Sequence, residues 1–184
     1  MPDAAAEERL RWTSVPRSPD PALPAAASYL ACWFGAAGEG RARALLAAAD
    51  PDVPVRTAAF AARWEPAAEA SLRRLIGGCF TGVRIILAGP EAAVLRAAAL
   101  ASSLGAASEE VVLLPADAAA SGYVTGPAGR RVFCATCRTS FDAVAALDDP
   151  VTCPGCAARL TVDRPFSRPH AAYFGWPAGL DLHR

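Results

Sequence analysis

The sequence predicts an α/β fold in two parts, and two observations lead to that prediction. Strand-like and helical segments alternate over residues 28–114, with glycine and proline in the connecting turns. After residue 130 the chain changes to short strand-like runs and two C-x-x-C pairs. This order predicts a Rossmann-like, doubly wound and mostly parallel sheet, followed by a small C-terminal zinc ribbon with four cysteine ligands.

The composition limits what the chain can do. Its 184 residues carry a formal net charge of +0, and all 18 basic residues are arginine. A cationic field of the kind that non-specific nucleic-acid binding needs is therefore excluded. Leu, Ile, Val and Phe together number 39, while alanine alone numbers 45, so we expect a core with few large side chains.

The cysteine chemistry depends on the compartment. No stretch approaches the roughly 18 consecutive apolar residues of a membrane span, and Met1–Arg11 lacks the apolar region of a secretory signal. We therefore predict a cytoplasmic protein. A reducing compartment favours metal binding over disulfides for the six cysteines.

The N-terminal part begins with an arm and then alternates. Four prolines between residues 16 and 24 predict that residues 1–24 form a flexible, Pro-rich arm. Ser28–Phe34 is a short apolar run with aromatic residues and predicts a strand, which we expect the glycines of Gly35–Gly40 to end. Glu39–Ala49 has the composition of a helix. Val53–Phe60 is strand-like, but its proline suits the start or edge of a sheet.

Proline opens a predicted helix over Pro66–Ile76. The clearest segments follow it and predict a βαβ unit, with a buried strand over Val83–Ala88, a helix of about 14 residues over Glu91–Leu104 and a further strand over Glu110–Leu114. We expect the Rossmann-like domain to span residues 25–118. The Ala-, Gly- and Pro-rich stretch 115–129 predicts the boundary before a zinc-ribbon domain with an aromatic tail at 130–184.

Four cysteines have the spacing of a metal site. Cys134 and Cys137 form one C-x-x-C pair, Cys153 and Cys156 the other, and 15 residues separate the pairs. Two residues between thiolates form a tight turn that aims both sulfurs at one point about 2.3 Å away. Pro154-Gly155 supplies turn chemistry, with the glycine free to take a positive φ. We predict that these four residues bind Zn²⁺.

Other interpretations of the cysteines stay open. Iron is the main alternative to zinc, because C-P-G-C also suits a rubredoxin-like site; disulfides or a redox dithiol are less favoured. Cys32 and Cys79 lie in apolar contexts and are predicted to be packed as small hydrophobic residues. Four arginines lie close to the pairs in sequence and could offset the thiolate charge, namely Arg130, Arg131, Arg138 and Arg159.

The sequence contains no recognisable catalytic set. The glycines of Gly35–Gly40 do not have the dinucleotide spacing, and Glu39 would repel a phosphate, so cofactor-binding residues remain unknown. The only histidines are His170 and His183. Phe166–Trp176 gathers four aromatic residues and is either a tail closing over the C-terminal or first domain or a docking surface.

These residues together resemble a known family. The order VFCATC, a 15-residue spacer, CPGC and FSRPHAAYFGW, over residues 130–176, resembles the DmmA-like small subunit of bacterial dimethylamine monooxygenase, a haem-dependent oxidative N-demethylase system. The four cysteines match the family's metal-binding pairs, and Ser167-Arg168 matches its tail motif. Ala157 departs from the pattern, because such turns often place glycine after the second cysteine.

The resemblance implies a subunit of an NADPH- and O₂-dependent enzyme complex. Haem would lie on one partner, and FMN and a 2Fe–2S cluster on a reductase, not on this chain. We expect a non-catalytic accessory or assembly subunit that contacts these partners and no membrane. The alternatives are a nucleotide-binding or electron-relay component, or a stand-alone module for nucleic acid or protein. Residues 121–184 carry a net charge of only +2, which disfavours nucleic acid.

Overall fold

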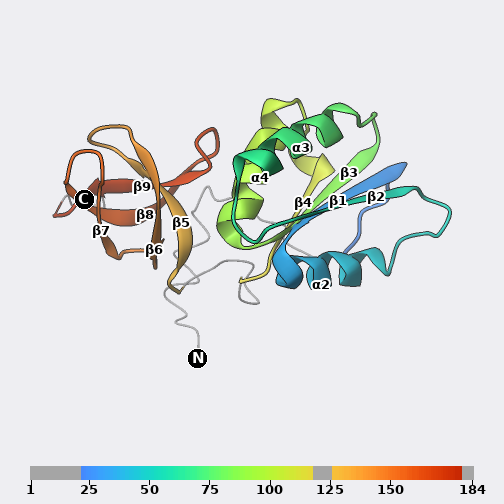
Figure 1. Cartoon of the computed structure of the whole chain (residues 1–184), viewed down its shortest axis with the longest axis horizontal. Helices are drawn as coiled ribbons and strands as arrows, with labels where there is room; N and C mark the ends of the chain where they lie inside the picture. The colour runs from blue at the N-terminus through green and yellow to red at the C-terminus, as the bar shows by residue number, and fades with distance from the viewer. Residues whose placement is uncertain (1–21, 118–125, 180–184) are drawn as a thin grey trace. The chain divides into compact units, whose positions relative to one another are not determined.

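The computed structural model describes residues 22–117 and 126–179, which fall into two compact units (Figure 1). Sheet A belongs to the first unit and sheet B to the second. Most of the predicted arm, residues 1–21, lies outside the described residues, as does His183. No helix within the described part of the chain is long and apolar enough to cross a bilayer.

Sheet A is a parallel sheet built by regular alternation. The four strands lie in the order β2-β1-β3-β4, and every neighbouring pair is parallel. The elements in chain order are β1 (Ser28–Phe34), α2 (Gly35–Leu46), β2 (Val55–Phe60), α3 (Pro66–Gly77), β3 (Val83–Gly89), α4 (Glu91–Ser103), a 3₁₀ turn η1 (Ser108–Glu110) and β4 (Val111–Pro115). The predicted α/β arrangement is confirmed.

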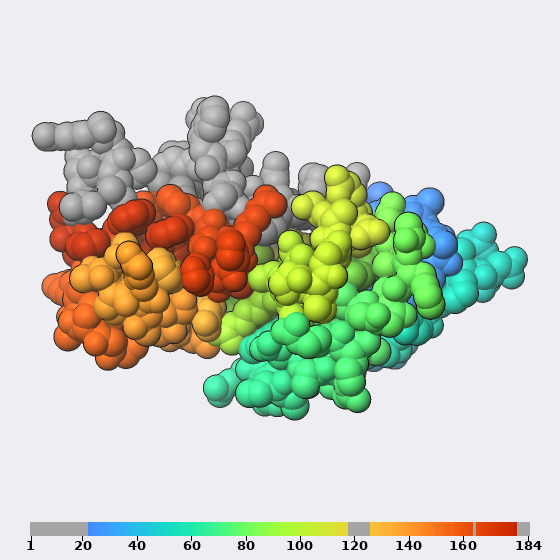
Figure 2. Space-filling model, turned by 90° about the horizontal axis from the view of Figure 1, so that it is seen from above, coloured from blue at the N-terminus to red at the C-terminus, as the bar shows by residue number. Residues whose placement is uncertain are grey.

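Helices cover both faces of sheet A because the central strands are apolar on both sides. From β1, Leu30, Cys32 and Phe34 pack with residues of α3 and α4, whereas Tyr29, Ala31 and Trp33 pack with residues of α2. Figure 1 shows α2 on one side of the sheet and α3 and α4 on the other. From above, α3 and α4 form the outer layer of this unit (Figure 2).

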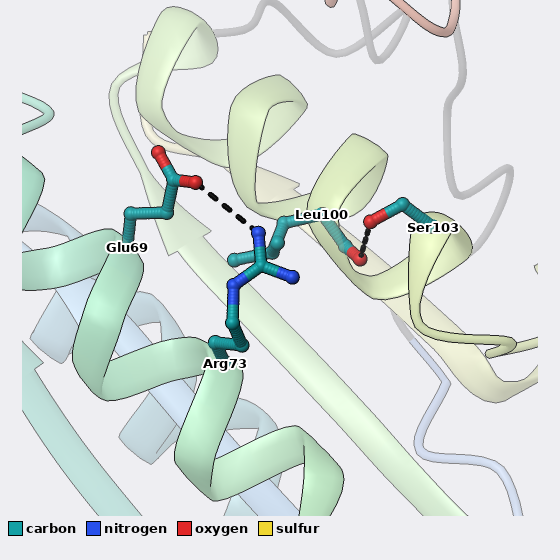
Figure 3. Close-up of polar contacts among 4 residues, drawn as sticks. All are labelled: Glu69, Arg73, Leu100 and Ser103. Atoms are coloured by element: carbon teal, nitrogen blue, oxygen red, sulfur yellow. Dashed lines mark hydrogen bonds and ion pairs between the residues drawn. The ribbon is translucent and has the colours of Figure 1, made fainter.

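Local contacts fix the ends of α3 and α4. Pro66 occupies the first turn of α3, where its missing N–H would have no helical partner. The Arg73 guanidinium donates to Glu69 at 3.3 Å on the surface of α3, and at the end of α4 the Ser103 hydroxyl donates to the Leu100 carbonyl at 2.7 Å (Figure 3). The backbone N–H at the start of α4 donates to Asp117 Oδ1 at 3.0 Å.

The structure corrects the predicted start of the first helix. The glycines of Gly35–Gly40 were expected to form a turn before a helix at residue 39, but α2 begins directly at Gly35. Gly35 has φ +70°, which lets the chain pass from strand to helix without an intervening loop. Gly38 lies against β3, where an added Cβ would come within 2.5 Å of the Ala88 carbonyl oxygen.

Sheet B is a mixed sheet of five strands in the order β6-β5-β9-β8-β7. The strands are β5 (Ala128–Cys134), β6 (Ser140–Ala145), β7 (Pro150–Thr152), β8 (Arg159–Ser167) and β9 (Ala172–Pro177). The pair β5–β9 is parallel and the other pairs are antiparallel.

The aromatic tail therefore forms the middle of sheet B. The runs that flank the cysteine pairs, Arg131–Phe133 and Arg159–Val162, suggest two strands that pair with each other; they are strands, in β5 and β8, but β9 lies between them and pairs with both. Gly175 makes this insertion possible, because a Cβ there would come within 2.8 Å of Val132 and 2.9 Å of Leu160. The part of the tail in β9 thus belongs to the sheet, and the side chains of Phe174 and Trp176 there remain half-exposed.

Candidate metal centre

Two hairpins of sheet B bring the four predicted cysteines together. Cys134 ends β5 and Cys137 lies in the turn before β6; Cys153 follows β7 and Cys156 lies in the turn before β8. Their four Sγ atoms all lie within 4.8 Å of one another. All four are free thiols, so the cluster is available to a metal ion.

The sulfur separations fit a tetrahedral ion. The Sγ atoms of Cys134 and Cys156 are 3.8 Å apart, and those of Cys137 and Cys153 are 3.6 Å apart. Four sulfurs placed about 2.3 Å from a central zinc would be separated by about 3.8 Å along each edge of the tetrahedron. The geometry and the soft thiolate donors therefore suit Zn²⁺ or iron, and they do not distinguish the two metals.

The two turns have the same backbone geometry. The N–H of Cys134 donates to the Thr139 carbonyl at 2.9 Å, and the N–H of Cys153 donates to the Ala158 carbonyl at 2.9 Å. The residue after each second cysteine takes a positive φ, +64° at Arg138 and +58° at Ala157. Ala157 stands where such turns often have glycine, and its backbone is left-handed, a conformation that glycine would adopt without strain.

Gly155 has a different role from the one its sequence context predicts. It does not take a positive φ; instead, an added Cβ would approach Thr139 Oγ1 to 2.8 Å and Cys137 Sγ to 3.3 Å. Its N–H also lies 3.4 Å from Cys153 Sγ, to which it donates. Glycine is therefore required because the two turns approach each other closely, and this requirement is invisible within either turn alone.

The thiols differ strongly in acidity without a metal. Hydrogen bonds from the Thr139 side chain and backbone lower the pKa of the Cys137 thiol to about 6. At Cys156 a hydrogen bond with the Ala158 backbone favours the thiolate, but desolvation and the neighbouring cysteine thiols outweigh it and raise the pKa to about 12. The sequence did not mark Thr139 as part of this site. Its position two residues after Cys137 is the only feature that could have pointed to it.

Two of the four arginines predicted to offset the thiolate charge, Arg130 and Arg131, have partners other than the cysteines. Arg130 is buried, with 1% of its surface exposed; it donates to the carbonyls of Gly126 and Ala145 and stacks over the Tyr173 ring. It therefore serves the core of sheet B rather than the cysteines. Arg131 pairs with Asp142 at 3.9 Å.

The remaining predicted residues lie away from the cluster. Cys32 is fully buried in the core of sheet A, and burial raises its pKa to about 12, as expected for a packed hydrophobic residue. Cys79 packs against the same core and contacts Arg56. Ser167 ends β8, and Arg168 and His170 are exposed in the turn before β9.

One face of sheet B carries a row of adjacent aromatic rings, which we call the aromatic face. The ring of Phe133 lies 4.6 Å from His170 and 5.6 Å from Phe174, and Phe174 stacks on Trp176 at 5.3 Å. Their side chains are exposed or half-exposed. Phe133 lies outside the tail, and sequence reasoning missed it because only the pairing of β5 with β9 brings it there.

The comparisons with known proteins agree with the predicted resemblance over this unit. Residues 131–176 match the family model of the C-terminal domain of dimethylamine monooxygenase subunit DmmA-like proteins, over 46 of the 184 residues. The DmmA-like resemblance is thus confirmed for these residues. Neither the curated proteins nor the solved structures yield a match.

Proposed function

We propose that this chain is a non-catalytic accessory subunit of an amine monooxygenase complex of the dimethylamine type. The observation that carries the proposal is the four-cysteine cluster lying inside the segment that matches the DmmA-like C-terminal domain. In this proposal residues 25–118 form a Rossmann-like domain, residues 130–184 form a zinc-ribbon domain, and haem, FMN and 2Fe–2S reside on partner subunits.

The four cysteines would hold Zn²⁺ as a structural ion. When bound, the ion supplies a cross-link between the two hairpins, which share few large apolar side chains near the cluster. The buried residues there are Cys134, Cys153 and Leu160. The chain's own contribution is the pair of turns whose backbone N–H groups and positive-φ residues aim the sulfurs at one point.

The aromatic face would contact the partner subunits. Aromatic side chains are enriched at the centres of protein interfaces, and a row of rings held on paired strands loses little conformational entropy on binding. The half-exposed rings of Phe174 and Trp176 lie on β9, whose backbone is fixed by both neighbouring strands. The surface is therefore ordered before a partner arrives.

A variant of this surface tests the assignment. Co-expressed with the products of neighbouring genes, the full chain should co-purify with the haem and reductase subunits, and Phe174→Ser/Trp176→Ser should reduce the recovered partners at least about tenfold. Phe80→Ser is the matched control, because Phe80 is 87% exposed but lies outside sheet B. A chain that always elutes alone would refute the proposal.

An electron-relay function is the second candidate, and the exposure of Cys137 and Cys156 favours it. Iron held by these thiolates would lie near the protein surface, within reach of a redox partner. A ferric thiolate site is coloured and a zinc site is not, so the visible spectrum separates the two. A calorimetric titration with NADPH tests nucleotide binding by the first unit, and the accessory function predicts no heat.

The thiol acidities predict how zinc affinity changes with pH. At neutral pH Cys137, with a pKa of about 6, is already a thiolate, whereas Cys156, with a pKa of about 12, must lose its proton when zinc binds. Because protons compete with the metal, affinity should rise with pH by at least about tenfold per unit between pH 6.5 and 8. Competition with a chromophoric chelator measures it, and a pH-independent affinity would contradict the proposed ligands.

A further inference from the structure

We propose that β2 is a dimerisation edge, at which a second copy of this chain pairs antiparallel with it and joins two copies of sheet A. The proposal rests on three features of β2: the direction of its unpaired backbone groups, the exposure of its side chains and the charges at its two ends. It does not depend on the metal centre or on the accessory function.

The backbone of β2 offers three residues to a partner strand. The N–H of Tyr29 donates to the Pro54 carbonyl, so Pro54 and the alternate residues after it face β1. Val55, Thr57 and Ala59 therefore point their N–H and C=O groups away from β1, and among the described residues no other strand pairs with them. A two-fold axis beside Thr57 would place Thr57 opposite itself and Val55 opposite Ala59, which satisfies all six of these groups on each copy.

The side chains of β2 are unusually exposed for a parallel strand. Parallel strands are normally covered on both faces, yet Val55 is 41% exposed and Arg56, Thr57 and Ala59 are exposed as well. The opposite edge strand, β4, is buried over Val112–Leu114. The strand pairs with β1 without a register shift, so no bulge turns its free edge away from a partner strand.

The charges beside β2 favour self-pairing in the antiparallel direction. Exposed Asp50 and Asp52 precede the strand, and exposed Arg63 follows it. Pairing centred on Thr57 places the end of β2 that Arg63 follows, with Glu65 two residues beyond it, near the end of the other copy that Asp50 and Asp52 precede, so Arg63 of each copy faces the acidic end of the other. Parallel pairing would bring like charges together. The edge is thus complementary to a second copy of itself.

A disulfide placed at the two-fold axis tests the pairing directly. Opposed residues of a hydrogen-bonded antiparallel pair have Cα atoms about 5.5 Å apart, within disulfide range. Full-length Thr57→Cys should therefore cross-link into a dimer under mild oxidation. Val55→Cys is the matched control, because two copies of Val55 would lie about 13 Å apart along the strands and should not cross-link. No cross-link at Thr57→Cys, or an equal yield at both positions, would overturn the proposal.

Charge reversal tests the direction and the partner. By sedimentation equilibrium the unmodified chain should be a dimer, and Asp52→Arg or Arg63→Asp alone should raise its dissociation constant about tenfold. The double variant should recover part of the lost affinity, because positions 52 and 63 again carry opposite charges while Asp50 is unchanged. A wild-type chain that is monomeric at all concentrations, or a double variant as weak as the single ones, would contradict the pairing.

Discussion

Removing the metal from the full chain is expected to unfold the C-terminal unit while sheet A stays folded. The C-terminal unit is small, and a core of this size supplies only about 3–5 kcal/mol. Structural zinc supplies roughly 10–16 kcal/mol in finger peptides, so we expect a zinc ion bound by the four cysteines to decide whether the unit folds. After chelation, hydrogen exchange should show lost protection in β5 and β9 and unchanged protection in β1 and β3.

Cysteine variants separate metal loss from other effects of the chelator. Cys153→Ser should reproduce the loss of protection in β5 and β9, because three thiolates hold the ion much more weakly than four. Cys79→Ser is the control, since Cys79 is a free cysteine that packs against the core of sheet A. Persistent protection of β5 and β9 after complete metal removal would show that the hairpins do not need the ion.

Gly38→Ala is expected to destabilise the first unit by about 3 kcal/mol. The added Cβ would lie 2.5 Å from the Ala88 oxygen and 2.9 Å from the Gly89 Cα, and both are backbone atoms of the central strand β3. Neither can move without disturbing the pairing of β3 with its neighbours. Calorimetry should show the unfolding transition of this unit lowered by roughly 15 °C.

Gly40→Ala is the matched control on the same helix. Gly40 lies inside α2, and apart from the backbone of its own helix no described atom lies within 4 Å of the position that its Cβ would take. Alanine is favoured over glycine in a helix by up to about 1 kcal/mol, so this variant should be slightly more stable. Equal effects of the two substitutions would show that α2 does not pack closely against β3.

Much of sheet A could be predicted from the sequence because its signals are local. The apolar run of β3 and the proline at the start of α3 each mark their element without help from distant residues. The helix α2 begins earlier in the chain than predicted, because a glycine-rich segment is typical of a turn. Two of its glycines, Gly35 and Gly38, are required by contacts with Ala62 and Ala88, which are distant in sequence.

The candidate site likewise combines a local feature that the sequence predicts with long-range contacts that it does not. The spacing of the cysteines predicted the cluster, since each C-x-x-C turn is a local structure. The position of β9 between β5 and β8 is a long-range pairing, and no short sequence pattern reports it. The aromatic face depends on that pairing, because Phe133 and Phe174 become neighbours only when β5 and β9 lie side by side.

Elemental analysis of the purified full chain, joined to its hydrogen-exchange profile, tests the whole account most directly. We expect one zinc ion per chain, lost together with the order of both hairpins when Cys134 is replaced by serine. A preparation that contains no metal yet keeps these hairpins protected would contradict the assignment of the four sulfurs, and with it the proposed subunit function.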